Sequence, residues 1–336
     1  MLGVVGYLCV DMIPDLGPSP FAFVPGQLRE IGGTPLFAGG SVANTGGSLC
    51  KLGLPTRLGA LLGDDLFGGF LREFLHTLAP EENLFLKTIS GEPTGQTIVL
   101  NPAGQDRMFL TCRGVNDQMT ADSFRTFTEG LDLLHYGYPT LSRFMAQNNG
   151  AETIRLFQNA HEHGALTSLD LALPSPGTVF WTLDWMAFLK NVLPGTDLFC
   201  PSIDELRFML KDQSSAPEAL ADATLQMGCH AVFLKMGAEG SLLKVADTDA
   251  AETALARFGS HEWRGVYKRV KPRPGPVVGT TGAGDSAIAG MLAGLHEGLS
   301  AARALDLANA VASYNVRVAD SLSGIPTLAF LQKEGF

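Results

Sequence analysis

The chain has 336 residues, 46% of them hydrophobic and 17% charged, which is typical of a globular protein with a large core. Its formal net charge of −10 and its pI of about 5.2 argue against binding to nucleic acid or to an anionic membrane surface. The N-terminus lacks the basic residues of a signal peptide, and no apolar run approaches the ~18 residues of a membrane-spanning helix. Five cysteines lie far apart without a C-x-x-C pair, so we expect reduced thiols in a cytoplasmic protein.

Predicted strands and helices alternate along most of the chain. The apolar run LGVVGYLCV at 2–10 predicts one strand buried on both faces, and a helical pattern begins after Gly39-Gly40 and stops at Gly53. Beyond this point the patterns predict strands at 55–63, 131–139, 165–173, 197–202, 231–237 and 240–245. They predict helices at 65–78, 142–163, 180–192, 203–211, 216–227, 285–297 and 300–319, whereas the polar stretch 246–276 gives no clear pattern.

One segment interrupts this alternation. Residues 94–114 contain two β-rich runs on either side of NPAGQD, residues 101–106, which has the composition of a hairpin turn. With part of the Pro/Gly-rich stretch 12–36, this hairpin is expected to form a small separate sheet. The sequence therefore predicts one α/β domain over 1–336, in which helices flank a doubly wound, mostly parallel sheet and a small β-sheet forms a lid.

The segment TTGAGDSAIAGM, from Thr280, places Gly282-Ala283-Gly284 directly before Asp285 and a buried helix. Free N–H groups and the positive end of the helix would hold an anion there. The alternative is that Asp285 simply caps the helix, which is a common role for aspartate. P-loop and nucleophile-elbow motifs are absent. Gly282, Gly284 and Ala287 formally match a dinucleotide-binding pattern. The match is weak because that fold needs a strand after the helix, whereas a second helix is predicted here, so a dehydrogenase is only a distant alternative.

Two long motifs carry a family resemblance. TTGAGDSAIAGMLAGL resembles the C-terminal signature of the ribokinase-like sugar kinases, the PfkB carbohydrate kinase family, and FAGGSVANTGGSLCKLG resembles the N-terminal Gly-Gly signature of that family. The motifs occur in the family's order, and the resemblance extends over nearly the whole chain. It implies a ribokinase-like fold and an enzyme that uses ATP and Mg²⁺ to phosphorylate a hydroxyl of a sugar or sugar-like small molecule.

The resemblance also implies residue roles around the acceptor. Asp285 is expected to be the catalytic base, and the backbone N–H groups of Gly282, Ala283 and Gly284 are expected to form an anion hole for the transferred phosphoryl group. The predicted acceptor-binding residues are Asp11, Gly39, Gly40 and Asn44. A carboxylate and an amide suit vicinal hydroxyls, although aspartate and asparagine are also ordinary turn and cap residues.

Three further side chains end predicted strands at the same rim of the sheet. His135 and Tyr138 come from HYGYP and Asp170 comes from SLDLALP. Ligands of open α/β sheets bind at this rim, so Asp170 is predicted as a secondary substrate contact. For His135, a place in the core is the safer interpretation.

The nucleotide side follows from two more motifs. PSIDEL resembles the family's Asn-x-x-Glu motif, with Ser202 where asparagine is usual, so Glu205 is expected to bind magnesium indirectly. The alternative is that Glu205 is only an acidic residue in the first turn of a helix, where the helix dipole favours it. LKMGAEG resembles the strand and turn beside the nucleotide. The remaining nucleotide-binding predictions are Lys235, Gly237, Gly240, Thr280 and Asn309.

The chain departs from the family pattern at two positions. Gly279 replaces an aspartate that supports a monovalent-cation site in some members, and Ser41 replaces a lysine found in some ribokinases. Arg107 and Arg113 of the lid are candidates to pair with an anionic group on the substrate. The resemblance further implies pairing of two lids in a homodimer. A nucleoside kinase of the same fold and a non-catalytic nucleotide- or sugar-binding protein remain alternatives.

Overall fold

The structure, a computed structural model, describes residues 1–18, 22, 24–105, 107–259 and 262–336. Within these residues the larger sheet has nine strands in the order β13-β12-β11-β10-β9-β8-β1-β4-β5. Its strands are β1 (Leu2–Gly6), β4 (Thr56–Gly63), β5 (Leu84–Ile89), β8 (Leu133–Gly137), β9 (Leu166–Asp170), β10 (Leu198–Phe199), β11 (Ala231–Lys235), β12 (Ser241–Val245) and β13 (Tyr267–Val270). Neighbouring strands pair in parallel from β5 to β11, and the last two pairings are antiparallel. The predicted doubly wound, mostly parallel sheet is confirmed.

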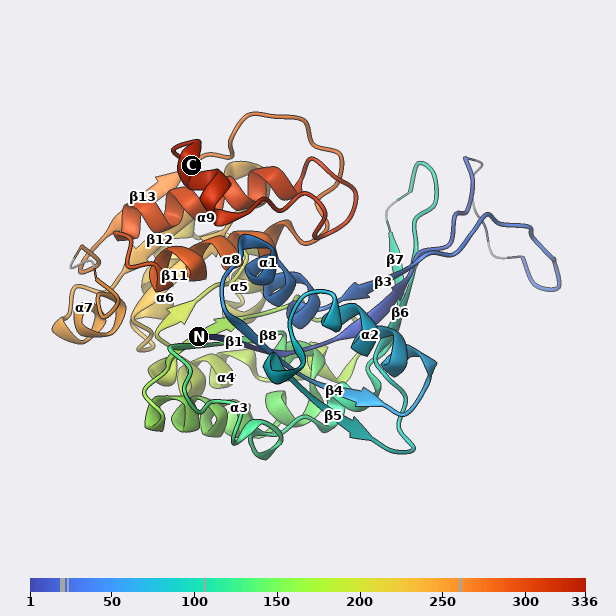
Figure 1. The fold of residues 1–336 in the computed structure, drawn as a ribbon, viewed down its shortest axis with the longest axis horizontal. Helices are drawn as coiled ribbons and strands as arrows, with labels where there is room; N and C mark the ends of the chain where they lie inside the picture. Colours follow the sequence, from blue (N-terminus) through green and yellow to red (C-terminus); the bar gives the residue numbers. More distant parts are fainter. Residues whose placement is uncertain (19–21, 23, 106, 260–261) are drawn as a thin grey trace.

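Helices cover both faces of this sheet (Figure 1). Successive side chains of a strand point to opposite faces, so Val4 and Val5 of β1 belong to two separate buried clusters. The cluster around Val4 includes residues of α1 (Gly47–Leu52), α2 (Leu66–His76), α7 (Asp249–Leu255), α8 (Ala283–His296), α9 (Ala301–Asn315) and α10 (Leu328–Lys333). The cluster around Val5 includes residues of α3 (Arg143–Glu162), α4 (Trp185–Val192), α5 (Ile203–Leu210) and α6 (Pro217–Leu225). No helix in the described part of the chain is long and apolar enough to cross a bilayer.

The smaller sheet has the strand order β3-β2-β6-β7, with β2 (Cys9–Met12), β3 (Leu36–Gly39), β6 (Gln96–Leu100) and β7 (Met108–Cys112). Figure 1 shows it projecting to one side of the main body. The predicted hairpin between β6 and β7 is confirmed, although residue 106 of its turn lies outside the described residues. Part of the stretch 12–36 was expected to form strands of this sheet. Among its described residues, only Met12 at the end of β2 and Leu36 at the start of β3 do so. Residues 19–21 and 23 within it also lie outside the described residues.

The prediction of one strand over residues 2–10 is wrong. β1 ends at Gly6 and pairs in the large sheet, whereas β2 begins at Cys9 and pairs in the small one. Between them, the Leu8 N–H donates to Oδ1 of Asn116 at 3.1 Å, and Asn116 Nδ2 donates back to the Leu8 carbonyl at 2.9 Å. A side chain 108 residues away thus replaces the strand partner at the point where the chain passes from one sheet to the other.

Several predicted helices differ from the structure in their details. The helix after Gly40 opens as a π-helical turn, Val42–Gly46, before α1. Residues Gln147–Gly150 interrupt α3 with non-helical backbone angles. The segment predicted as a helix over 180–192 is a 3₁₀ turn followed by the shorter α4. The polar stretch 246–276, which gave no clear pattern, contains α7 and β13, with residues 260–261 outside the described residues.

Candidate active site

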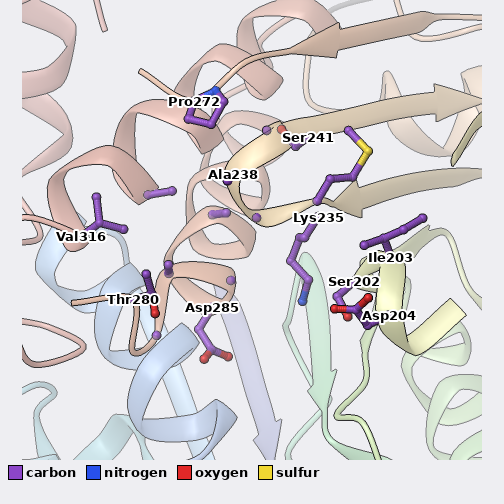
Figure 2. Close-up of a pocket in the computed structure, with 18 of the residues that line it drawn as sticks. Ser202, Ile203, Asp204, Lys235, Ala238, Ser241, Pro272, Thr280, Asp285 and Val316 are labelled. Carbon is purple, nitrogen blue, oxygen red and sulfur yellow. The ribbon is translucent and has the colours of Figure 1, made fainter. Parts of the chain in front are cut away.

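A cavity of about 920 Å³ lies at the carboxyl ends of strands β9 and β11 and at the start of α8. This is the edge at which open α/β sheets bind ligands. Twelve residues predicted for the site line it: Asp170, Ser202, Glu205, Lys235, Gly237, Gly240, Thr280, Gly282, Ala283, Gly284, Asp285 and Asn309. In Figure 2, Thr280 and Asp285 lie on neighbouring turns, and Lys235 extends into the space between Asp285 and the segment with Ser202 and Asp204.

Asp285 is a buried carboxylate surrounded by hydrogen-bond donors. The hydroxyl of Tyr138 lies 2.8 Å from both Oδ1 and Oδ2, the hydroxyl of Thr45 donates to Oδ1 at 3.0 Å, and Asn44 Nδ2 donates to Oδ2 at 3.2 Å. Burial raises the pKa of Asp285, whereas the charge of Lys235 and the three donors act in the opposite direction. The carboxylate is therefore held in place with its basicity increased, as a general base requires.

The alternative that Asp285 caps its helix is wrong. Helix α8 begins at Ala283, two residues earlier than expected, and its N-cap is Gly282, whose φ of 72° is left-handed. Asp285 is the third helical residue, and its side chain bonds residues from distant parts of the chain. A Cβ on Gly282 would lie 2.5 Å from Cβ of Ser321, so both the backbone angle and the packing require glycine there.

The predicted anion hole is built from the first turn of α8. The Ala283 N–H already donates to the Thr280 carbonyl at 3.2 Å, so this amide has a partner within the protein. Among the described residues, the N–H groups of Gly282, Gly284 and Asp285 have no backbone acceptor. Such amides at a helix N-terminus can bind an anion. The available donors thus differ from the predicted set in one member, because the N–H of Asp285 takes the place of that of Ala283.

A buried cation stands beside this turn. Lys235 Nζ donates to Oδ1 of Asp170 at 2.6 Å, and the exposed fractions of the two side chains are 14% and 1%. Nζ would lie 3.6 Å from a Cβ on Gly284. Burial alone lowers the pKa of Lys235, but the negative charges of Asp170, Glu205 and Asp285 reverse this effect and raise it. These neighbouring carboxylates therefore favour the charged form of Lys235.

Glu205 and Ser202 form a capping box at the start of α5. Oε2 of Glu205 accepts a hydrogen bond from the Ser202 N–H at 2.6 Å, and the Ser202 hydroxyl accepts one from the Glu205 N–H at 3.3 Å. Glu205 therefore does act as an acidic residue in the first turn of a helix, which was the alternative to a role in binding magnesium. Both residues also line the cavity, and burial raises the pKa of Glu205 while Lys235 opposes this shift.

The predicted nucleotide-binding residues border the same cavity from β11 and α9. Gly237 and Gly240 have φ values of 53° and 91°, and a Cβ on Gly240 would lie 1.9 Å from the Val270 carbonyl oxygen. This close approach requires glycine at position 240. Asn309 Nδ2 donates to the carbonyl of Lys271 at 2.7 Å, which ties α9 to the segment after β13.

Among the predicted acceptor-binding residues, Asn44 is in direct contact with Asp285. Asp11, Gly39, Gly40 and Asn44 are not among the described lining residues of the cavity, but Asn44 bonds Asp285 directly. A Cβ on Gly39 would lie 2.2 Å from Oδ2 of Asp11, so the Asp11 carboxylate rests against the glycine backbone. Gly40 has a φ of 90° and its carbonyl accepts the Asn44 N–H at 2.9 Å. These contacts connect the two motifs through the Asn44–Asp285 bond.

The departures from the family pattern have local structural reasons. A Cβ on Gly279 would lie 2.9 Å from the Val318 carbonyl, so this backbone leaves no room for an aspartate. Ser41 is buried, and its hydroxyl donates to the Gly137 carbonyl at 3.3 Å. Arg113 makes a bidentate ion pair with Asp117 and stacks on Phe180. Its proposed pairing with the substrate is therefore weakened.

Sequence reasoning missed part of the shell around Asp285. The sequence motifs predict no role for Thr45, and they predict Tyr138 only at the rim of the sheet, although both side chains bond Asp285. His135 is a core residue, as the safer interpretation held, and Nδ1 of its ring lies 3.0 Å from the hydroxyl of Ser168. The alternation of apolar residues in HYGYP gives no signal that Tyr138 turns toward α8. Arg107, by contrast, does line the cavity.

Comparison with known protein families identifies the class of this protein. The model of the pfkB family carbohydrate kinases matches residues 2–328, so the chain belongs to this family. It is 24% identical over 312 residues to 2-dehydro-3-deoxygluconokinase of Bacillus subtilis, an alignment that covers 90% of this chain and 87% of the relative. The predicted family is confirmed, the protein is a carbohydrate kinase, and the nucleoside kinase alternative is not favoured.

Solved structures agree on the fold. Ribokinase of Arabidopsis thaliana in complex with ribose and ATP superposes with a TM-score of 0.77 at 21% identity, covering 99% of this chain and 97% of that one. A putative ribokinase II of E. coli in complex with ATP and Mg²⁺ has a TM-score of 0.74 at 21% identity, with coverage of 99% and 97%. The ribokinase-like fold predicted from the two glycine motifs is therefore confirmed.

Proposed function

We propose that the protein transfers the γ-phosphoryl group of ATP to a hydroxyl of a sugar, with Asp285 as the general base. The observation that supports this most directly is the position of Asp285. Its buried carboxylate borders the cavity, immediately next to the free amides of the first turn of α8. A proton acceptor and an anion-binding turn are the two groups that an in-line phosphoryl transfer needs side by side.

In this reaction the acceptor hydroxyl oxygen forms a bond to the γ-phosphorus while the bond from that phosphorus to the bridging oxygen of ADP breaks. The hydroxyl proton passes to Asp285. The N–H groups of Gly282, Gly284 and Asp285 bind the oxygens of the transferred group, and Lys235 offsets part of the negative charge. Asp11, Gly39, Gly40 and Asn44 bind the acceptor, with Asp170 as a secondary contact. Gly237, Gly240, Thr280 and Asn309 border the nucleotide.

Magnesium fits the residues present. Mg²⁺ prefers oxygen ligands and is commonly held by one or two carboxylates together with phosphates and water. Among the described residues, no group of three or more His, Cys, Asp and Glu side chains is arranged to hold a metal without help. We propose that the ATP phosphates and, through water, Glu205 would hold the ion, with Ser202 beside it. When bound, the ion would offset the charge of the phosphates.

The smaller sheet supports a further proposal about assembly. Met12 pairs with Leu36 and with Ile98, and Ile98 pairs with Leu110, so these apolar side chains share one face of the sheet. Leu36 and Leu110 are 39% and 49% exposed. We propose that this sheet is a lid over the acceptor and that it pairs through this face with the lid of a second copy. We also propose that the protein works in the cytoplasm.

The proposed dimer has a direct test. Leu110→Glu places a charge on the apolar face at the edge strand β7. We expect this variant to be monomeric when sedimentation is measured at micromolar concentration, and we expect the unaltered protein to be a dimer there. Thr111→Glu places the same charge on the opposite face of β7 and serves as the matched control. A monomeric unaltered protein would contradict the proposed pairing without touching the proposed chemistry.

The proposed reaction is tested by an acceptor panel. The sugars are D-ribose, D-fructose, fructose 6-phosphate, 2-dehydro-3-deoxygluconate and 5-dehydro-2-deoxygluconate, and the nucleosides are adenosine and inosine. ADP release with Mg²⁺ and ATP is measured for each compound, and the phosphorylated product is identified by mass. We expect turnover of at least one sugar. Turnover of nucleosides alone, or ligand binding without turnover of any compound, would contradict the proposal.

A further inference from the structure

The residue after β8 has an unusual backbone. Tyr138 adopts a left-handed conformation, with φ of 66° and ψ of 50°, which is uncommon for any residue other than glycine and unfavourable for a bulky one. Pro139 follows and disfavours the right-handed helical region for Tyr138. The conformation directs the phenol toward the start of α8, where its hydroxyl meets both oxygens of Asp285. Strained backbone of this kind tends to occur at functional sites.

Three donor groups surround both oxygens of Asp285. An ionised carboxylate offers about four lone-pair sites. Oδ1 accepts from Thr45 and Tyr138, and Oδ2 accepts from Asn44 and Tyr138, which gives four contacts. Because the two contacts of Tyr138 share one proton, an acceptor hydroxyl that donates its proton to Asp285 competes with Tyr138 for one of the two oxygens.

The contact that opens most easily belongs to Tyr138. Its single O–H proton is shared between two oxygens at equal distances of 2.8 Å, so it can leave one oxygen and still bond the other. Tyr138 also lines the cavity from which the acceptor approaches. The side chain of Thr45 is fully buried, so its hydroxyl has less freedom, and Asn44 Nδ2 contacts only one oxygen of Asp285.

We infer that Tyr138 is a positioning residue, which holds Asp285 through both carboxylate oxygens in the free enzyme and moves to one oxygen when the acceptor hydroxyl binds to the other. This inference rests on the proposed role of Asp285 as base. Burial, and then the negative charge of Asp285, raise the pKa of Tyr138 well above its usual value. The phenol therefore keeps its proton and remains a donor throughout the reaction.

The test compares two variants that each remove one hydroxyl. Tyr138→Phe keeps the ring but removes both contacts with Asp285, and Tyr136→Phe makes the same change inside β8, two residues earlier. Steady-state kinetics are measured with the sugar that the unaltered enzyme turns over fastest in the panel above. In Tyr138→Phe we expect kcat to fall about tenfold or more, the size of a hydrogen bond to a charged group, while KM for the sugar is unchanged or lower. Tyr136→Phe should stay within about twofold, because Tyr136 packs in the apolar core and is not one of the donors to Asp285.

Two results would overturn the inference. A raised KM with unchanged kcat would make Tyr138 a substrate contact only, and unchanged values of both would remove its role. A second measurement combines Tyr138→Phe with Asp285→Asn. If Tyr138 acts through Asp285, the added change has no further effect on turnover, whereas an independent loss contradicts the inference. Absence of turnover in the unaltered enzyme would instead contradict the proposed function itself.

Discussion

Replacing Lys235 with methionine tests the charge balance of the cavity. Methionine keeps much of the length of the side chain but removes the cation that bonds Asp170, whose side chain is only 1% exposed. The protein can avoid an unpaired buried charge by protonating Asp170. At pH 7, protonating a carboxyl with an ordinary pKa near 3.9 costs about 1.36 × 3.1, or about 4 kcal/mol. Since burial already raises the pKa of Asp170 in the folded protein, this figure is a ceiling, and we expect a loss of about 2–4 kcal/mol of unfolding free energy.

The assay is urea denaturation followed by circular dichroism at pH 7. The matched control is Lys190→Met on α4, an exposed lysine for which we expect a change within about 0.5 kcal/mol. The double variant Asp170→Asn/Lys235→Met removes both charges and should regain most of the lost stability. The reasoning is refuted if Lys235→Met loses less than about 1 kcal/mol, or if the double variant is no more stable than Lys235→Met alone.

Two further predictions concern single side chains. Gly282→Ala should lower the free energy of unfolding by about 1–2 kcal/mol and reduce turnover at least tenfold. The reason is that the left-handed backbone is unfavourable for alanine and that its Cβ would clash with Ser321. A variant with an unchanged denaturation midpoint and kcat would contradict this prediction. The hydrogen bond to Asp197 raises the pKa of His161 in the folded protein. The stability that this bond contributes is therefore fully present below about pH 6.5, the pKa of histidine in the unfolded chain, and it is lost as the pH rises through the pKa of His161 in the folded protein. His161→Gln should therefore cost more at pH 5.5 than at pH 8.5, by no more than about 1 kcal/mol since the ring is partly exposed, and an equal cost at both values would contradict the assignment.

Much of the fold could be predicted because its signals are local. Buried parallel strands leave apolar runs, and helices leave amphipathic or small-residue patterns, so the alternation was visible along the chain. The turn at Gly282 was equally visible, because a left-handed angle and a close neighbour permit only glycine there. The cavity then brings together residues of β9, β11, α5, α8 and α9 in the way that a doubly wound sheet requires.

The failures share a physical cause, which is that long-range partners leave no local pattern. The break between β1 and β2 depends on Asn116, whose side chain replaces a strand partner at Leu8. Both halves of the run are buried, so hydrophobicity alone favours one continuous strand. The phenol of Tyr138 likewise reaches a carboxylate 147 residues away. Its left-handed backbone is not a propensity of tyrosine, and it becomes apparent only in the folded chain.

Asp285→Asn tests the central claim most directly. The amide keeps the shape of the side chain but cannot accept the proton of the acceptor hydroxyl. ATP affinity is measured by calorimetry with Mg²⁺, and kcat is measured with the best sugar of the panel. We predict that Kd for ATP stays within about threefold while kcat falls at least about a hundredfold, the usual effect of losing a general base. A variant that retains more than a tenth of the unaltered kcat would show that another group takes the proton, and the assignment of Asp285 would be wrong.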